Sequence, residues 1–292
     1  MVRIGLVGAG RRAADVYAPA LASSPAIDFA GIWARSPDPL SRLAERHRVP
    51  AHGRYADLLD RCDAVVFAVP PAAQVGLAAT AALQGRAVLL ERPIAADEAG
   101  AEELVIAVTK KKVVSQVALP WRYSSAVRHF LDTDVPRTSP AGGRGQVVSR
   151  LPAAGSPVSP WRLQRGVLHA EGADLLDLLD ASLGPVVHLR AHGDRRGWIG
   201  MLLDHQIGRF SEASLYWTAA DEPNRAEVEV FGPAGSAAVD CTAVVGPETF
   251  QRMVGEFAQA VDRGTSPDLD VQHGPHLQEL IEAAETYLIA GS

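Results

Sequence analysis

Residues 1–13 read MVRIGLVGAGRRA, and this stretch decides the fold that the sequence predicts. A short apolar run leads into the spacing G-x-G-x-x-A, formed by Gly8, Gly10 and Ala13, and a helix-like segment follows. Gly8 permits a tight turn, Gly10 lets a pyrophosphate approach bare backbone, and the small Ala13 lets the helix pack closely on the strand. The first turn of that helix offers free N–H groups to phosphate. The stretch predicts a dinucleotide-binding turn; the alternative is a purely structural turn.

The composition is that of an ordinary globular protein. The 292 residues suffice for about two domains, and 47% are hydrophobic against 21% charged. The net charge of -6 is spread without long runs, so we expect no nucleic-acid partner. No apolar stretch reaches the ~18 residues of a membrane span, and the first residues read as a buried strand and not as a signal peptide. Cys62 and Cys241 lie far apart and form no C-x-x-C. We expect a reduced, cytoplasmic protein without disulfide or zinc.

The first part of the chain alternates strand and helix patterns. Strand candidates lie at residues 3–7, 29–34, 64–69, 87–90 and 113–117. Helical stretches lie between them at residues 12–22, 39–46, 74–83 and 97–110. The strands are continuous apolar runs, as expected when helices cover both faces of a sheet. The pattern predicts a doubly wound parallel sheet of the Rossmann type.

The second predicted strand ends on Ala34, Arg35 and Ser36, and these residues bear on the choice of cofactor. NAD-selective sites carry an acidic residue about 20 to 25 positions after the glycines, where it binds the ribose hydroxyls. This strand end has no carboxylate. Arg35 can face a 2′-phosphate and stack on adenine, and Ser36 can donate to the phosphate. With the added charge of Arg11 and Arg12, the pattern favours NADP(H) over NAD(H), unless these arginines are only surface residues.

The second part of the chain has a different pattern. Residues 133–164 shift toward Pro, Gly, Ser and Arg, with a strand candidate at 145–151 and an irregular loop at 152–160. A helix is predicted over 167–183, where leucines recur at helical spacing. Alternation with period two then predicts strands at 187–192, 199–205, 209–218, 226–230 and 236–240, followed by amphipathic helices at 249–263 and 274–289. We expect a largely antiparallel sheet in an α+β domain, with one face packed and the other polar or paired.

Further motifs accompany the glycine turn along nearly the whole chain. They are VGAGRR at 7–12, the run 67–71 before a helix, LLERP at 89–93, WRY at 121–123, GVL at 166–168, Gly172 with Asp177, EFAQAVDRG at 256–264 and LQELIEAAE at 277–285. Together they make the chain resemble the Gfo/Idh/MocA oxidoreductases, the family of glucose–fructose oxidoreductase and inositol dehydrogenase. The resemblance is far more specific than the glycine turn alone.

The resemblance implies an architecture and a mode of action. It implies a Rossmann dinucleotide-binding domain over residues 1–119 and an α+β domain with an open sheet over residues 120–292. It also implies a nicotinamide over the cleft, a small-molecule substrate, and assembly into a homodimer or homotetramer through the open sheet.

The chain departs from the family at the residues that carry the chemistry. Arg92 stands where the family has the lysine of its E-K-P motif, and Ala170 and Asp174 stand where its second-domain helix supplies an Asp and a His. Asp177 retains the last Asp of that helix, and the three helix positions share one face. Arg92 is always protonated and cannot act as a base, but it can hold a carboxylate or polarise a carbonyl. Asp174 is either a proton relay, if its pKa is raised, or a supporting residue.

The resemblance also implies contacts with the cofactor. Val69, Pro70 and Gln74 follow the third predicted strand, where the family touches the nicotinamide ribose; the alternative is a plain turn. Glu91 matches the family's cofactor-side carboxylate. The Arg92–Pro93 bond corresponds to one that is often cis in the family, in a tight turn that would aim Arg92.

Six residues are expected to face the substrate or to cover the nicotinamide: Trp121, Arg122, Tyr123, Trp161, Arg162 and His169. Core packing is the alternative for Trp121. His169 points about 100 degrees away from the face of Asp174 in an ideal helix, so a structural role is its alternative. The other histidines form no ligand set, and we expect no metal.

Two functions follow from these observations. The first is an NADP(H)-dependent reductase of a C=O, C=N or C=C bond in a small polar metabolite, with specialised metabolism as the expected setting. A reductase can draw its proton from water, a substrate group or Asp174. The second is a non-redox protein that binds a nucleotide or ligand as a regulator or a cyclase. Nucleotide binding with a productive site geometry distinguishes the first from the second.

Overall fold

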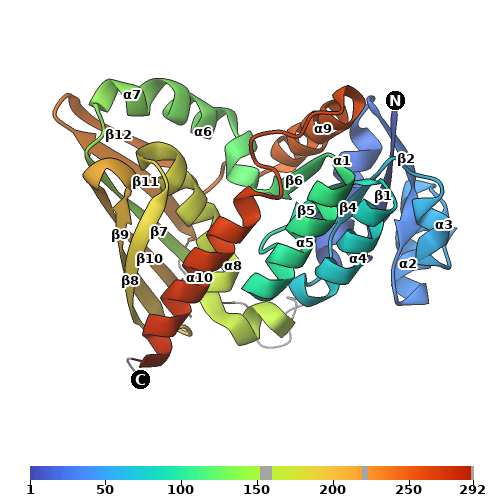
Figure 1. Cartoon of the computed structure of the whole chain (residues 1–292), viewed down its shortest axis with the longest axis horizontal. Helices are drawn as coiled ribbons and strands as arrows, with labels where there is room; N and C mark the ends of the chain where they lie inside the picture. Colours follow the sequence, from blue (N-terminus) through green and yellow to red (C-terminus); the bar gives the residue numbers. More distant parts are fainter. Residues whose placement is uncertain (152–159, 219–222, 291–292) are drawn as a thin grey trace. The chain divides into compact units, whose positions relative to one another are not determined.

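The structure, a computed structural model, describes residues 1–151, 160–218 and 223–290. It divides into two units. The first unit comprises Met1–Ala118 and Pro247–Gln278, and the second comprises Leu119–Gly246 and Glu279–Ser292. Each unit is built around one six-stranded sheet, which we name sheet A and sheet B (Figure 1).

Sheet A is parallel throughout. Its strands are β1 (Val2–Val7), β2 (Ile27–Trp33), β3 (Ala51–His52), β4 (Ala64–Phe67), β5 (Ala87–Glu91) and β6 (Ser115–Ala118). Their order is β3-β2-β1-β4-β5-β6, so the direction of winding reverses between β1 and β4. Ligands of doubly wound sheets bind beyond the carboxyl ends of the strands at such a switch point. The predicted Rossmann sheet is confirmed.

Helices cover sheet A on both faces. They are a π-helical stretch, Ala13–Tyr17, that runs into α1 (Ala18–Ser23), then α2 (Pro37–His47), α3 (Tyr55–Leu59), α4 (Pro71–Leu83), α5 (Glu98–Lys111) and α9 (Pro247–Arg263). Figure 1 shows α4 and α5 side by side on one face. Asp97 caps α5, because its carboxylate accepts a hydrogen bond from the Gly100 N–H at 2.9 Å. The sequence patterns missed β3 and α3, which are too short to show a period.

Helix α9 belongs to the first unit although it follows sheet B in the sequence. Its apolar residues Phe250, Met253 and Phe257 recur at helical spacing, and all three are buried. The helix packs against α1 and β1. The structural division therefore differs from the expected contiguous domains 1–119 and 120–292: the boundary near residue 118 agrees, but residues 247–278 return to the Rossmann unit.

Sheet B is mixed. Its strands are β7 (Gly142–Arg150), β8 (Val186–Gly193), β9 (Trp198–His205), β10 (Arg209–Thr218), β11 (Arg225–Gly232) and β12 (Gly235–Asp240), in the order β12-β11-β7-β10-β9-β8. The β7–β10 pair is parallel, and the other pairs are antiparallel. The expected largely antiparallel sheet is confirmed, with one parallel pair that results because β7 is inserted between β10 and β11.

Helix α8 (Pro160–Leu183) covers one face of sheet B. Gly145 lets α8 approach closely, since a Cβ there would lie 2.6 Å from Cδ1 of Leu175. The helix is interrupted at Gly166, where φ is 80° and a Cβ would lie 2.3 Å from the carbonyl oxygen of Arg195. The regular part therefore begins at Val167, as predicted. The loop expected at 152–160 lies outside the described residues except for Pro160.

The remaining helices of the second unit are short, apart from the last. They are a 3-10 turn (Pro120–Tyr123), α6 (Ser125–His129), a π-helical stretch (Phe130–Asp134), α7 (Val135–Thr138) and a 3-10 turn (Gln206–Gly208). Helix α10 (His273–Ala290) has its first residues in the first unit and the others in the second. In the described parts of the chain, no helix is both long and apolar enough to span a membrane.

A buried histidine joins two strands of sheet B, β9 and β10, to the end of α8. His205 contacts the Gly184 carbonyl oxygen through Nδ1 at 2.6 Å and the Ser211 hydroxyl through Nε2 at 2.7 Å. A carbonyl oxygen only accepts, so Nδ1 carries the proton and Nε2 accepts from Ser211. Burial lowers the pKa of His205, although Gly184 and Asp180 oppose the shift.

Because the pKa of His205 is lower in the folded state, the unfolded state binds more protons between the two pKa values. We expect the free energy of unfolding to fall as the pH drops below about 6.5, the unfolded value for histidine. His205→Gln should flatten this dependence, measured by urea unfolding between pH 8 and pH 5.5. His129→Gln, at an exposed position of α6, is the control. An unchanged pH slope in His205→Gln would contradict the assignment.

Candidate functional site

The glycine turn lies at the carboxyl end of β1, between β2 and β4. The Gly8 N–H donates to the carbonyl oxygen of Trp33 at the end of β2, at 2.8 Å. The Ala68 N–H, just beyond β4, donates to the Val7 carbonyl oxygen at 2.8 Å. Gly8 has φ of +116°, and a Cβ there would lie 2.5 Å from the Ala68 oxygen. Only glycine fits this position.

Gly10 meets the opposite condition. A Cβ at Gly10 would have nothing within 4 Å, and the residue is exposed. Its backbone therefore borders open space at the start of the helix, where unsatisfied N–H groups attract anions. The turn fits a dinucleotide in the way the sequence predicts: Gly8 is required by the fold, and Gly10 leaves the approach open.

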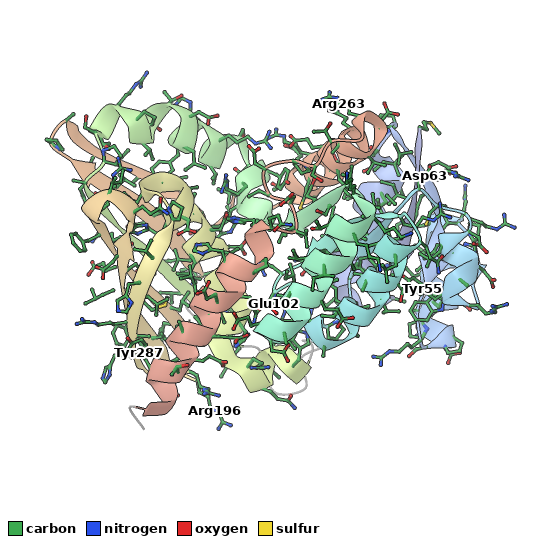
Figure 2. The ribbon with its side chains drawn as sticks, viewed as in Figure 1. Tyr55, Asp63, Glu102, Arg196, Arg263 and Tyr287 are labelled. Atoms are coloured by element: carbon green, nitrogen blue, oxygen red, sulfur yellow. The ribbon has the colours of Figure 1, made fainter. Side chains whose placement is uncertain are left out.

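Arg35 and Ser36 follow β2 and are exposed. Ser36 is the N-cap residue of α2, yet its side chain makes no capping hydrogen bond. The hydrogen bond between Gly8 and Trp33 brings this segment next to the glycine turn. The indole of Trp33 packs on Tyr55, labelled in Figure 2, with ring centroids 5.0 Å apart. A rigid aromatic pair thus supports the end of β2.

The two arginines of the turn have different surroundings. Arg11 is exposed, and its Nε donates to Asp15 at 3.1 Å. Arg12 is directed into the unit: its Nε and Nη2 both donate to Oε1 of Glu91, at 3.0 and 2.9 Å. The Arg12 guanidinium also lies over the rings of Tyr17 and Phe250, at 5.7 and 5.0 Å.

Glu91, the last residue of β5, is the centre of a buried polar cluster. Besides Arg12, the hydroxyl of Tyr17 donates to the same oxygen, Oε1, at 2.5 Å. Burial and the charge of Glu91 raise the pKa of Tyr17 well above its usual value. Burial by itself would lower the pKa of Arg12. The interactions of Arg12 with Glu91 and Tyr17 outweigh burial, so the pKa of Arg12 is raised. Arg12 is therefore a cation and Tyr17 a neutral hydrogen-bond donor at any working pH.

Gln74 in α4 holds the backbone around Glu91. Its Nε2 donates to the carbonyl oxygens of Glu91 and Ile94 at 2.8 and 2.9 Å, and its Oε1 accepts from the Glu91 N–H at 2.9 Å. Gln74 is fully buried. The structure thus gives Gln74 a structural role, and its contact with the cofactor stays a prediction. Val69 and Pro70 remain partly exposed between β4 and α4.

Arg92 follows Glu91 and is buried. The Arg92–Pro93 peptide is cis, as the resemblance implies. The positive charge of Arg92 acts on Arg12 and on Tyr17, where it lowers both pKa values slightly against the larger effects above. The guanidinium of Arg92 is therefore close to the Glu91 cluster.

The second unit positions the residues expected on α8. Asp174 and Asp177 are buried, as is Ala170. Arg122, in the 3-10 turn after β6, donates through Nη1 to Oδ1 of Asp177 at 3.0 Å. Burial, with a contribution from the charge of Asp174, raises the pKa of the Cys241 thiol to about 12. Cys241 therefore stays a thiol and offers no nucleophile.

The other expected substrate residues also have defined contacts. Trp121 and Tyr123 are buried, and Arg128 lies over the Tyr123 ring at 5.4 Å. Arg162 lies over the Trp161 ring at 5.3 Å in the first turn of α8. His169 is buried, and its Nε2 lies 3.0 Å from Oε1 of Glu285 in α10.

The contact of His169 agrees with the structural alternative. The interaction of Glu285 with His169 outweighs the burial of that carboxyl and lowers the pKa of Glu285. Arg165 also lies 3.4 Å from Glu285. His169 thus joins α8 to α10 within the second unit, and its contact with a substrate stays a prediction.

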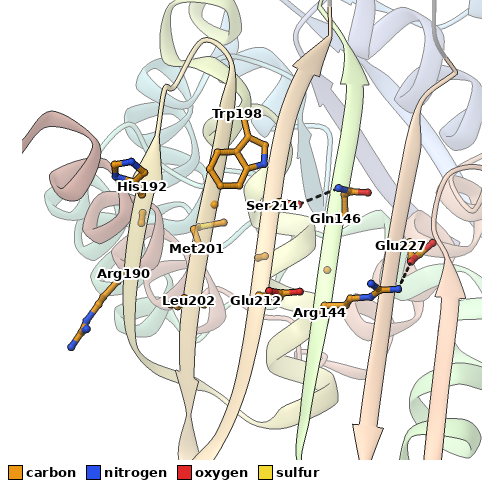
Figure 3. A pocket seen from close by; sticks show the side chains of 14 residues that line it. Arg144, Gln146, Arg190, His192, Trp198, Met201, Leu202, Glu212, Ser214 and Glu227 are labelled. Atoms are coloured by element: carbon orange, nitrogen blue, oxygen red, sulfur yellow. Dashed lines mark hydrogen bonds and ion pairs between the residues drawn. The ribbon is translucent and has the colours of Figure 1, made fainter. Parts of the chain in front are cut away.

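The face of sheet B opposite α8 forms a shallow hollow of about 570 Å³ (Figure 3). Its lining includes Arg144, Arg190, His192, Trp198, Leu202 and Glu212. Arg144 pairs across the strands with Glu229 at 2.8 Å. Half of the Trp198 surface and 65% of the Leu202 surface are exposed. Among the described residues, no group of three His, Cys, Asp or Glu side chains could hold a metal ion.

The Rossmann part of the chain matches a family model described as an oxidoreductase family with an NAD-binding Rossmann fold. The match covers residues 2–119. These residues belong to the Gfo/Idh/MocA oxidoreductase family. The family resemblance inferred from the motifs is confirmed for residues 2–119.

Two relatives and a solved structure are similar to longer parts of this chain. A Salmonella typhimurium protein named as the oxidoreductase YceM is 29% identical over 129 residues, or 44% of this chain and 42% of that relative. The dTDP-3,4-didehydro-2,6-dideoxy-α-D-glucose 3-reductase of Streptomyces antibioticus is 27% identical over 271 residues, or 87% of this chain and 79% of that relative. The structure of GenD2 from gentamicin A biosynthesis, in complex with NAD, has a TM-score of 0.87 at 19% identity and covers 100% of this chain and 95% of its own. At that identity it shows a shared fold.

The sequence missed Tyr17 and Phe250, which complete the Glu91 cluster. Tyr17 lies in the π-helical stretch, where one extra residue per turn rotates later side chains by about 100 degrees relative to a regular helix. Phe250 comes from α9, far along the chain. A tyrosine about two turns after the glycines was the only available signal, and it has many structural explanations.

The two glycines of the turn allow a matched test of their roles. Gly8→Ala should lower the free energy of unfolding by about 1–3 kcal/mol, because a Cβ meets the Ala68 oxygen at a left-handed backbone position. Gly10→Ala should change it by less than about 0.5 kcal/mol, because the Cβ enters open space. Urea unfolding measures both. Equal destabilisation by the two substitutions would contradict these roles.

Proposed function

We propose that this protein is an NADP(H)-dependent reductase that acts on a small polar metabolite, most directly on the carbonyl group of a sugar-like compound. The observation that carries the cofactor choice is the hydrogen bond from Gly8 to Trp33, which brings Arg35 and Ser36 next to the phosphate-binding turn. The first carboxylate after the strand is Asp38, which lies in the first turn of α2. A guanidinium and a hydroxyl at this position suit a 2′-phosphate.

The relatives support the class of reaction. The Streptomyces antibioticus relative is named for the reduction of a keto group on a deoxysugar nucleotide, and the similarity to it covers most of both chains. Reductions of C=N and C=C bonds remain within the proposal, because they need the same hydride donor. The NAD in the GenD2 structure makes the choice between NADP(H) and NAD(H) the first point to test.

The residues of the first unit suit reduction better than oxidation. A bound reduced nicotinamide supplies a hydride to the substrate carbon. Arg92 is a permanent cation next to the Glu91 cluster, so it can stabilise the negative charge that develops on a carbonyl oxygen but cannot remove a hydroxyl proton. The proton that the oxygen needs can come from water or from Asp174, whose role as a relay is part of this proposal.

An equilibrium titration with NADPH and NADH tests the cofactor choice. Wild-type protein should bind NADPH at micromolar concentration or more tightly, and Arg35→Ala should weaken NADPH binding by about ten-fold while changing NADH binding little. Arg42→Ala, at an exposed position of α2, is the matched control and should bind both nucleotides like the wild type. Nucleotide fluorescence gives the dissociation constants.

The outcomes of this titration separate the two functions. If NADH binds as tightly as NADPH and Arg35→Ala has no effect, the NADP(H) choice is wrong. If neither nucleotide binds, the reductase is wrong as well, and a non-redox regulator or cyclase is left. If NADPH binds, its oxidation in the presence of keto-sugar nucleotides, other ketones and imines measures the substrate class.

We also propose that a second copy of this chain covers the hollow face of sheet B. The face exposes aromatic and leucine side chains, a composition typical of interfaces: Trp198, Leu202, Phe210, Tyr216 and Phe231. The two edges of this face differ in charge. Basic side chains lie on β8 at one edge: His188, Arg190 and His192. Acidic side chains lie on β11 and β12 at the other edge: Glu227, Glu229 and Asp240. A two-fold axis parallel to the strands places the basic edge of one copy over the acidic edge of the other.

Light scattering after gel filtration tests this interface. Wild-type protein should have the mass of a dimer or a tetramer, and Leu202→Asp should shift the mass toward the monomer because it buries a charge in the contact. Ile106→Asp is the matched control: Ile106 lies on α5, and both side chains are 65% exposed. A monomeric wild type, or the same mass for wild type and Leu202→Asp, would overturn the interface.

A further inference from the structure

We infer that Arg12 is a positioning residue, which holds the Glu91 carboxylate ionised and in a single orientation for the cofactor and does not itself bind phosphate. This inference rests on the proposed function, since it assigns Glu91 to the nucleotide site. It separates the two arginines of the glycine turn, which the sequence alone treats as equivalent.

The first support is the geometry at Glu91. Three donors converge on one carboxylate oxygen, Oε1: Nε and Nη2 of Arg12 and the hydroxyl of Tyr17, at 3.0, 2.9 and 2.5 Å. Charge-assisted bonds of this kind are short and directional. Because Oε1 is held from three directions, the covalent geometry of the carboxylate decides where Oε2 points. The side chain of Glu91 is only 8% exposed, so it has little freedom to leave this position.

The second support is the backbone of the same segment. Gln74 bonds the N–H and the carbonyl oxygen of Glu91 and the carbonyl oxygen of Ile94. The backbone of residues 91–94 is thus held by α4. The side chain of Glu91 is held by Arg12 and Tyr17, from the helical segment that follows the glycine turn. Arg92 lies inside this clamped segment, so the same contacts also restrict the placement of Arg92.

The third support is the difference between Arg12 and Arg11. Two N–H groups of Arg12 are used by Glu91, and its guanidinium plane lies over the Tyr17 and Phe250 rings. Moving it to a phosphate would break the ion pair and leave a buried carboxylate without its main counter-charge, which is costly. Arg11 has an exposed side chain and one i,i+4 partner, Asp15, so it can turn to an anion at low cost.

The fourth support is the position of the pair in sheet A. Arg12 follows β1 and Glu91 ends β5, and the two strands are separated only by β4. The ion pair therefore crosses the carboxyl end of β4, next to the switch point between β1 and β4. Ligands of doubly wound sheets bind at this edge. An ion pair with no function would not need to lie here.

A double-mutant cycle on NADPH binding tests the inference, with Arg12→Leu, Glu91→Gln and the double variant. If Arg12 acts through Glu91, each single substitution weakens NADPH binding by about ten-fold, and the double variant is also about ten-fold weaker than wild type. If Arg12 binds phosphate directly, the two effects multiply to about a hundred-fold. Arg12→Lys keeps the charge and should recover part of the affinity. Arg11→Leu is the matched control, and its effect should multiply with that of Glu91→Gln.

The pH dependence of binding provides a readout that a purely structural role would not move. The groups that face Glu91 are Arg12 and Tyr17 from the glycine-turn helix and the adjacent Arg92, while α4 contributes the neutral Gln74 and α9 the apolar Phe250. Without Arg12, the buried carboxyl takes up a proton more easily. Arg12→Leu should therefore lose more NADPH affinity at pH 6 than at pH 8, whereas Glu91→Gln should not show this difference.

Each outcome decides one question. Multiplying effects of Arg12→Leu and Glu91→Gln, with no added pH dependence, overturn the positioning role even if the wild type binds NADPH well. A wild type that binds neither NADPH nor NADH overturns the proposed function, and this inference with it. Thermal unfolding of every variant without nucleotide identifies any that fails to fold, and in that case Arg12→Gln replaces Arg12→Leu in the cycle.

Discussion

The first unit depends on the backbone conformation of a single residue, Gly8. A positive φ at this position turns the chain from β1 into the next helix, and the Ala68 oxygen occupies the space that a side chain would need. The same residue donates to Trp33, so β1, β2 and the segment after β4 meet at one point. Everything proposed for nucleotide binding follows from this junction, because it brings the end of β2 and the start of the helix to the same edge of the sheet.

Around that junction, the chain places its charges in two layers. Arg11 and Arg35 are exposed at the edge, where long cationic side chains can adjust to an anion. The half-buried Arg12 and the buried Glu91 form a pair that is held by aromatic rings and a tyrosine hydroxyl. Exposed pairs contribute little to stability, whereas breaking a buried one leaves an uncompensated charge. The outer layer is therefore suited to binding and the inner layer to keeping the site in one geometry.

The second unit shows how small residues can decide packing. Gly145 lets Leu175 of α8 approach sheet B, and Gly166 interrupts α8 where the Arg195 carbonyl oxygen comes too close for a side chain. With α8 on one face, the opposite face keeps its aromatic side chains and its charges exposed. An antiparallel sheet can leave one face to solvent, but exposed Trp198 and Leu202 side chains are unusual there and favour a partner.

The sequence by itself determined the strands and helices with clear periodicity, the glycine turn, the absence of a carboxylate at the end of β2 and the membership of the Rossmann part in its family. These features are local, because spacing, apolar runs and turn residues act on neighbours in the chain. Only the tertiary structure decided that Arg12 and Arg11 differ, that Gln74 bonds backbone, that His169 pairs with Glu285 and that α9 returns to the first unit. Each of these depends on residues far apart in the chain, and the extra residue of the π-helical stretch rotates Tyr17 in a way that no regular period predicts. Contacts of this kind arise from packing between distant segments, and local periodicity carries no information about them.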